Sequence, residues 1–234
     1  MSSLQNHVSG NNAQAPRVIP APLLLRIGFW ICIVIAIAAV LRRVFALVFP
    51  AQNGPPRMAG LDHAFASHAA LTLAHILPAL AFVALVPLVL LRRSSRLEWP
   101  ERWLFPLGLV VGITAYAMSR YSIGGWTERS AVYFYNSLFL FSLGRAWWYK
   151  ARGETWLKRR WLLRAVVILL GIATTRPVMG AFFATSSLSH LQPQQFFGMA
   201  FWIGFSINWM VVEIWLHGPR RASMPLNTKV PESS

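Results

Sequence analysis

Long apolar runs dominate this chain and restrict what it can fold into. Six of them approach or exceed the ~20 residues that a helix needs to cross a bilayer. Each is mostly Leu, Val, Ile, Ala and Phe and is bounded by charged residues, Gly or Pro, which commonly mark helix ends. The runs cover residues 23–41, 69–91, 103–119, 131–149, 161–184 and 194–216. We therefore predict an all-α fold, a polytopic membrane helix bundle with six transmembrane helices.

Composition and charge agree with a membrane location. The chain is 56% hydrophobic and 12% charged, whereas an average soluble domain is about 25% charged. Its net charge of +15 would attract the phosphates of nucleic acid. The cations, however, lie between the apolar runs, where the positive-inside bias explains them. We thus expect the lipid bilayer of the cell membrane, and no nucleic acid, as the partner.

The distribution of Lys and Arg also predicts the orientation. We expect three parts: a disordered N-terminal tail (1–22), a membrane domain (23–217) and a disordered C-terminal tail (218–234). Cations concentrate in the loops after the second and fourth runs and in the C-terminal tail, so both termini should be cytoplasmic. This arrangement gives Lys158, Arg159 and Arg160 only a positive-inside role. It also places Arg42 and Arg43 at the outer end of the first helix.

Arg176 stands inside the fifth apolar run. An arginine at membrane depth costs at least about 2.5 kcal/mol, so it needs a partner, water or a bound anion. At ~1.5 Å per residue, Arg176, His75 and Asn136 all fall in the outer third, where we expect no acidic partner for Arg176. These three could line an outward-facing pocket, with Arg42, Arg43 and Arg120 near the same level. The alternative is that the arginines extend to the lipid headgroups and His75 donates to a backbone carbonyl oxygen.

A second set of polar residues lies in the inner half. Glu213 is a carboxylate within an apolar run, and Arg164 is its expected partner, with Arg145 as the alternative. An ion pair would lower the burial cost of both charges, either as a structural link between helices or as part of a proton relay. Asn208 should lie near mid-membrane, where an amide must find a partner between helices. Together with the outer set, Arg164, Asn208 and Glu213 are candidate ligand-binding residues.

Histidine placement tests whether the chain binds haem. Membrane cytochromes hold each haem between two histidines on facing helices. His68 and His75 stand seven residues apart on one helix face, and His190 lies before the sixth run. Two haems would need two facing pairs, which this chain does not supply. One outer haem b, ligated by His75 with His190 or His68, is compatible with the spacing, as is a quinone. The commoner role of such histidines is hydrogen bonding, without a metal.

Sequence motifs for catalysis are absent, since the chain has no HExxH, no phosphate-binding GxxxxGK[ST] and no GxSxG. The sequence instead predicts a small binding or transport-type bundle with a polar cavity between helices. Its expected ligand is an anionic or carbonyl-bearing small molecule. The alternatives are a redox protein with one haem or a quinone, and a structural or assembly subunit.

The segment from Lys158 to Arg164, followed by Arg176, resembles an uncharacterised bacterial multi-pass membrane protein family. That family carries a His-Arg-Arg-Trp-Met-Ile-Arg run before a helix with a further Arg. His75 with Val86-Pro87, and Asn208 with Glu213, are similar to its second and closing helices.

The chain departs from that pattern at two positions. Lys158 stands where the family usually has His, and Glu101 stands near its other common loop His. If those histidines bind a cofactor or move protons in relatives, the resemblance implies that this chain lacks that activity.

Overall fold

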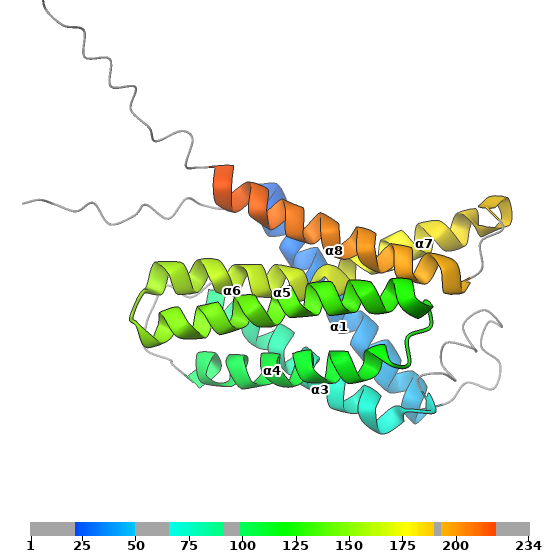
Figure 1. The fold of residues 1–234 in the computed structure, drawn as a ribbon, viewed down its shortest axis with the longest axis horizontal. Coiled ribbons are helices and arrows are strands. Elements are labelled where there is room, and N and C mark those ends of the chain that lie inside the picture. The colour runs from blue at the N-terminus through cyan, green and yellow to red at the C-terminus, as the bar shows by residue number, and fades with distance from the viewer. Residues whose placement is uncertain (1–21, 50–65, 91–98, 190–192, 219–234) are drawn as a thin grey trace, which may run out of the picture.

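The computed structural model describes residues 22–49, 66–90, 99–189 and 193–218, and the regular structure within them is helical. The helices are α1 (Leu23–Val48), α3 (Ala69–Leu90), α4 (Trp99–Ser119), α5 (Gly125–Ala151), α6 (Thr155–Leu169), α7 (Gly171–Ser189) and α8 (Pro193–His217). The predicted all-α class is confirmed. Both predicted tails lie outside the described residues, except for Pro22 and Gly218. Figure 1 places the start of α1 and the end of α8 at the same end of the bundle.

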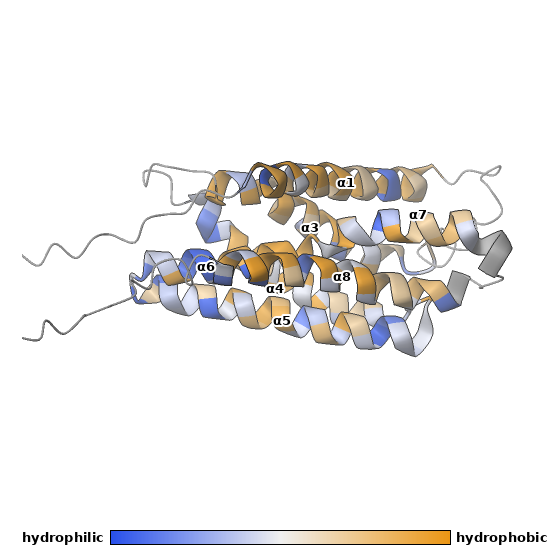
Figure 2. Ribbon diagram, turned by 90° about the horizontal axis from the view of Figure 1, so that it is seen from above, coloured by the Kyte–Doolittle hydropathy of each residue, from blue (hydrophilic) through white to orange (hydrophobic). Residues whose placement is uncertain are grey.

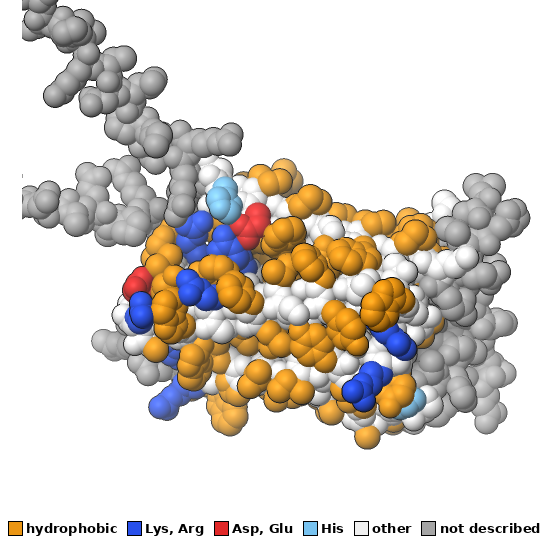
Figure 3. All heavy atoms as spheres, viewed as in Figure 1, with side chains coloured by type: hydrophobic (Ala, Val, Ile, Leu, Met, Phe, Trp, Pro, Cys, Tyr) orange, Lys and Arg blue, Asp and Glu red, His pale blue; other side chains and the backbone are white. Residues whose placement is uncertain are grey.

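Five helical segments among the described residues are long and apolar enough to cross a membrane. They are α1, α3, α4, the combined stretch Thr155–Thr185 of α6 and α7, and Gln195–His217 of α8. α5 has 27 residues, enough to cross as well, but its composition is more polar. The outer surface is apolar along much of its length, with Leu24 82% and Ile214 71% exposed. In Figures 2 and 3 hydrophobic residues fill the middle of the bundle, while Lys and Arg lie mainly near its ends. This surface fits a multi-pass membrane protein.

Two helix boundaries differ from the prediction. α1 continues through Arg42 and Arg43 to Val48, so both arginines lie inside the helix and not at its end. Arginine is a good helix former, and the next helix-breaking residue in the sequence is Pro50. α5 begins at Gly125, six residues before the predicted start, because Gly125 adopts a positive φ of 60° that turns the chain directly into the helix.

The fifth predicted helix is interrupted at Leu170, which separates α6 from α7. Glycine and proline follow closely, as Gly171 begins α7 and Pro177 lies within it. Pro177 lacks an N–H for the turn before it, which favours a change of direction there. Gly171 permits close packing, since a Cβ atom at this position would stand 2.6 Å from Cδ1 of Phe205 in α8. The predicted single helix is therefore corrected to two helices.

The interruption redirects the chain within the bundle. α6 packs along α5, whereas α7 packs along α8 and also contacts α1. Among the described residues, no Cα atom of α7 lies within 8 Å of a Cα atom of α5. Figure 1 shows α7 leaving the line of α6 and following α8. The separation of α7 from α5 leaves a space that α1, α3 and α4 help to enclose.

Candidate ligand-binding cavity

The space between α5 and α7 is a cavity of about 480 Å³, within the range of about 300–1,000 Å³ typical of small-molecule sites. Residues from α1, α3, α4, α5, α6, α7 and α8 line it, and most of them are apolar. The arginine, histidine, carboxylate and amide side chains in its wall are Arg42, Arg43, His75, Glu128, Asn136 and Arg176. The predicted outer set, Arg176, His75 and Asn136, thus comes together from three helices. That these residues bind a ligand stays a prediction.

Thr114 of α4 orients the ring of His75. Nδ1 of His75 lies 2.9 Å from the Thr114 hydroxyl. This hydroxyl lies 2.7 Å from the Val110 carbonyl oxygen, to which it donates its single proton. It must then accept from the histidine, so Nδ1 carries the ring proton and Nε2 keeps its lone pair. In this tautomer, a histidine on the cavity wall offers a hydrogen-bond acceptor or a metal ligand.

Asn136 is 9% exposed and links α5 to α4. Its amide nitrogen donates to the Gly112 carbonyl oxygen at 2.9 Å. The absence of a side chain at Gly112 lets the two helices approach closely here. A Cβ atom at this position would stand 2.4 Å from Cδ2 of Leu140. Asn136 therefore has a structural bond as well as a place on the cavity wall.

Three arginines gather at the cavity. Arg42 and Arg43 come from α1 and Arg176 from α7, and the first two lie close enough to Arg176 to repel it electrostatically. No hydrogen bond or ion pair joins the Arg176 side chain to a residue that the structure describes. Arg120, expected near the same level, does not line the cavity, and its carbonyl oxygen instead accepts from Nη2 of Arg129 at 2.8 Å. Among the described residues, the cavity wall therefore carries more cationic than acidic side chains.

One acidic residue, Glu128, lines the same cavity as Arg176. Glu128 is 8% exposed, and its Oε2 accepts from the Gly124 N–H at 2.7 Å. No ion pair between Glu128 and Arg176 occurs in the described structure. Sequence reasoning missed this residue because it placed Glu128 in a loop. The signal was the glycine pair at 124 and 125, which starts α5 early.

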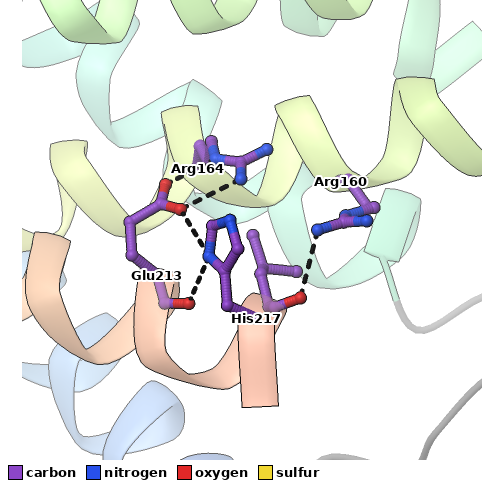
Figure 4. A network of polar contacts seen from close by, with 5 residues as sticks. Arg160, Arg164, Glu213 and His217 are labelled. Atoms are coloured by element: carbon purple, nitrogen blue, oxygen red, sulfur yellow. Dashed lines mark hydrogen bonds and ion pairs between the residues drawn. The ribbon is translucent and has the colours of Figure 1, made fainter. Parts of the chain in front are cut away.

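The predicted inner set does not reach the cavity. Arg164 of α6 pairs with Glu213 of α8, with Nε facing Oε1 and Nη2 donating to Oε2 at 3.0 Å. His217 adds a second contact, with its Nδ1 3.3 Å from Oε2 of Glu213. Figure 4 shows this group on the facing sides of the two helices. The predicted Arg164–Glu213 pair is confirmed as a link between helices.

The alternative partner of Glu213, Arg145, has different contacts. Its guanidinium lies over the rings of Trp148, Tyr149 and Trp161, at 4.6, 4.8 and 5.5 Å from their centroids. Nη2 of Arg145 also donates to the Tyr149 hydroxyl at 2.6 Å. Cation–π contacts of this kind stabilise a guanidinium where a carboxylate is not available.

Asn208 bridges the two sides of the interruption at Leu170. Its amide nitrogen donates to the Val167 carbonyl oxygen of α6 at 3.1 Å, and its oxygen accepts from the Thr174 hydroxyl of α7 at 2.7 Å. The predicted interhelical partner of this amide is thus present. Cys32 of α1 also reaches the site, with its sulfur 3.8 Å from Oγ1 of Thr174. Asn208 therefore stabilises the interruption between α6 and α7, beside which the cavity lies.

The cations at the start of α6 have specific partners, which the positive-inside rule alone did not predict. Nζ of Lys158 donates to both carboxylate oxygens of Glu101 in α4, at 3.1 and 3.2 Å. Nη2 of Arg159 donates to the Leu90 carbonyl oxygen at 3.1 Å. We call Lys158, Arg159, Arg160 and Arg164 the α6 cluster.

Arg160 completes the α6 cluster. Its Nη2 donates to the Leu216 carbonyl oxygen at 3.1 Å, near the end of α8 (Figure 4). Cations are favourable at helix C-termini, where carbonyl groups lack helical partners. The cluster therefore ties α6 to α3, α4 and α8 at one end of the bundle.

The other histidines of the haem hypothesis do not join His75. The ring of His68 lies 3.7 Å from that of Tyr121, and its Nδ1 is 3.0 Å from the Ser67 hydroxyl. His190 lies outside the described residues. Within the described part of the chain, no three His, Cys, Asp or Glu residues form a group able to hold a metal ion. Haem ligation stays a prediction.

Comparisons of this chain with known protein families, curated proteins and solved structures found no match. The resemblance stated from the Lys158–Arg164 segment therefore stays a prediction. The cavity must be interpreted from its own residues.

Proposed function

We propose that this chain is a cell-membrane protein that binds, and moves across part of the bilayer, a small anionic or carbonyl-bearing molecule in the cavity. The observation that carries the proposal is that Arg176, whose side chain has no hydrogen bond or ion pair to a described residue, lines one cavity with Arg42 and Arg43. An arginine at membrane depth is costly by itself, and a bound anion offsets that cost.

In this proposal α5 completes a set of six spans, and both termini face the cytoplasm. The α6 cluster then lies on the cytoplasmic side, as the positive-inside rule requires. The cavity lies toward the outer side, with His75 and Asn136 in its wall. His75 would accept a hydrogen bond through Nε2, and Arg176 would bind the anionic or carbonyl oxygen of the ligand.

The helix interruption supports a transport-type role over simple storage. Many transporters bind substrate beside a discontinuous membrane helix near the midplane. Here Ile168, Leu169 and Ile172, on both sides of the interruption at Leu170, line the cavity. Movement of α7 relative to α6 would therefore change the cavity directly.

The experiment is native mass spectrometry of the full-length protein, purified from its own membrane, together with Arg176→Gln. We expect a small molecule to accompany the wild-type protein and to be lost from the variant. The control is Arg152→Gln, because Arg152 lies over the Trp148 ring, 3.9 Å from its centroid, and does not line the cavity. An identical set of bound molecules in all three proteins would contradict the proposal.

A redox role is the second candidate, favoured by the fixed tautomer of His75. A neutral histidine with Nδ1 held by Thr114 presents the Nε2 lone pair to a haem iron or to the hydroxyl group of a reduced quinone. A visible spectrum of the purified protein separates these cases. A Soret band lost in His75→Ala would support haem, its absence would exclude haem, and solvent extraction followed by chromatography would detect a quinone. The remaining alternative, a structural subunit, predicts that Arg176→Gln changes only abundance and stability.

A further inference from the structure

The cavity has a polar end and an apolar end, and their order follows from helix register. His75 and Val83 of α3 both line the cavity, eight residues apart, as do Glu128 and Phe139 of α5, eleven residues apart. At 1.5 Å per residue these pairs span about 12 and 16 Å along the bundle. The cavity therefore extends from an ionisable rim to a floor that contains Val83, Phe139 and Ile168 beside the helix interruption.

One side of the cavity is apolar from rim to floor. Phe197, Phe201 and Phe205 follow each other at four-residue spacing along α8 and all line the cavity. The Phe197 and Phe201 rings lie 5.8 Å apart between centroids, as do the Phe201 and Phe205 rings. Such a continuous aromatic wall offers no hydrogen-bonding groups to a polar ligand, and it favours an extended apolar chain.

The charged side chains at the rim favour a ligand whose head group is negatively charged. Among the described residues, three arginines and one carboxylate, that of Glu128, line the cavity. Guanidinium groups bind phosphate and carboxylate through paired, charge-assisted hydrogen bonds, which are stronger in a medium of low dielectric constant. A neutral amphiphile would leave the charge of Arg176 without an anionic partner among the described residues, and a small polar anion would leave the floor unfilled.

We infer that the ligand is an amphiphilic anion, with a phosphate or carboxylate head at Arg42, Arg43 and Arg176 and an apolar tail along the α8 phenylalanines toward the interruption. This inference rests on the proposed function and specifies its ligand class. The head could belong to a membrane phospholipid or to a single-chain amphiphile, since both offer the same chemistry to the arginines.

The experiment places the full-length protein in phosphatidylcholine nanodiscs and titrates decyl phosphate, decanol and inorganic phosphate, with empty nanodiscs to subtract partitioning. Binding is measured by native mass spectrometry and by the rise in unfolding temperature. We expect decyl phosphate to bind at least about tenfold more tightly than decanol, which corresponds to about 1.4 kcal/mol. Inorganic phosphate should not compete with decyl phosphate for the cavity. Arg176→Gln should lower decyl phosphate affinity by about tenfold, whereas Arg152→Gln should leave it unchanged.

A second variant tests the tail without touching the arginines. Ala79 of α3 lines the cavity one helical turn deeper than His75, so Ala79→Leu would shorten the apolar channel. We expect this variant to bind hexadecyl phosphate much more weakly than the wild type does, and decyl phosphate somewhat more weakly. Its affinity for hexyl phosphate should be almost unchanged. An equal effect on all three chain lengths would overturn the placement of the tail.

Adding phosphatidic acid to the nanodiscs tests whether the anionic head group belongs to a membrane phospholipid or to a single-chain amphiphile. If it displaces decyl phosphate and this depends on Arg176, the ligand class includes a bilayer phospholipid. If it has no effect, the ligand is a single-chain anion. Equal binding of decanol, or equal binding of inorganic phosphate, would overturn the inference.

The two proposals fail separately. An Arg176-dependent molecule that co-purifies while decyl phosphate does not bind would overturn the ligand class and leave the proposed function standing. Absence of both would overturn the two together.

Discussion

At one end of the bundle the α6 cluster meets protein partners, whereas at the other end Arg42, Arg43 and Arg176 surround a cavity. Lys158 and Arg164 each pair with a carboxylate on another helix. Arg176 has no such bond to a described residue, and its close charged neighbours have the same sign. Arg164 belongs to α6 and Arg176 to α7, while Arg42 and Arg43 join the second region from α1. In the proposed function, similar side chains thus stabilise the fold in one place and bind a ligand in the other.

The largest expected effect on stability comes from removing Glu213, the partner of Arg164 in the α6 cluster. Glu213→Ala leaves Arg164 unpaired where its side chain is only 14% exposed and also removes the carboxylate contact of His217. We expect a loss of about 2–3 kcal/mol in the free energy of unfolding, at or below the low end for a buried pair because Glu213 is partly exposed. Thermal unfolding in detergent measures it. The control is Glu154→Ala at an exposed position near the same end of the bundle; equal losses in both variants would contradict a specific pair.

The boundary between the two regions gives the next effect. In Gly171→Ala, the new methyl group would collide with the Phe205 ring and push α7 away from α8. We expect about 1–2 kcal/mol of destabilisation from overpacking. Gly144→Ala is the matched control, since open space surrounds Gly144 in its helix. That control should be neutral or stabilising because alanine favours a helix, and the sign difference between the two variants is the test, read from unfolding temperatures.

A smaller effect is expected at the bridge across the interruption. Asn208→Ala removes the bonds to the Val167 carbonyl and the Thr174 hydroxyl, whereas Thr174→Val removes only the second. Hydrogen bonds between membrane helices average roughly 0.6 kcal/mol each. We therefore expect losses of about 1 kcal/mol and about 0.6 kcal/mol, measured by chemical unfolding. If Thr174→Val costs as much as Asn208→Ala, the bond to Val167 contributes nothing.

The smallest effect on stability, with the opposite sign, belongs to Arg176. Without a bound ligand, Arg176→Gln removes a charge that Arg42 and Arg43 repel, so stability should stay constant or rise by about 0.5 kcal/mol. Unfolding of the ligand-stripped protein measures it, with Arg164→Gln as the comparison that should destabilise. Equal losses in both variants would show that the two cationic regions have the same role.

Sequence reasoning predicted the features that depend on composition and on single residues. Run length predicted the helical membrane-type fold, and opposite charge within apolar runs predicted the Arg164–Glu213 pair. It also brought His75, Asn136 and Arg176 together by depth. It assigned Asn208 and Arg164 to the ligand as well, but neither lines the cavity.

The features it missed depend on packing in three dimensions. The interruption at Leu170 was hidden because the apolar run continues across it without a break. Glu128 was missed because a positive φ at Gly125 decides where α5 begins. The carbonyl partners of Arg159 and Arg160 lie on helices far away in sequence, so no local pattern indicates them.

The links that the α6 cluster makes at one end of the bundle have a mechanical consequence. The α6 cluster ties α3, α4 and α8 together at the end opposite the cavity, while α7 extends 19 residues beyond the interruption. At 1.5 Å per residue, α7 is a lever arm of about 28 Å whose fulcrum lies at Leu170. A tilt of about 5° moves its far end by about 2.5 Å, and the displacement decreases toward the fulcrum. A bend at this position would therefore displace the rim of the cavity more than its floor.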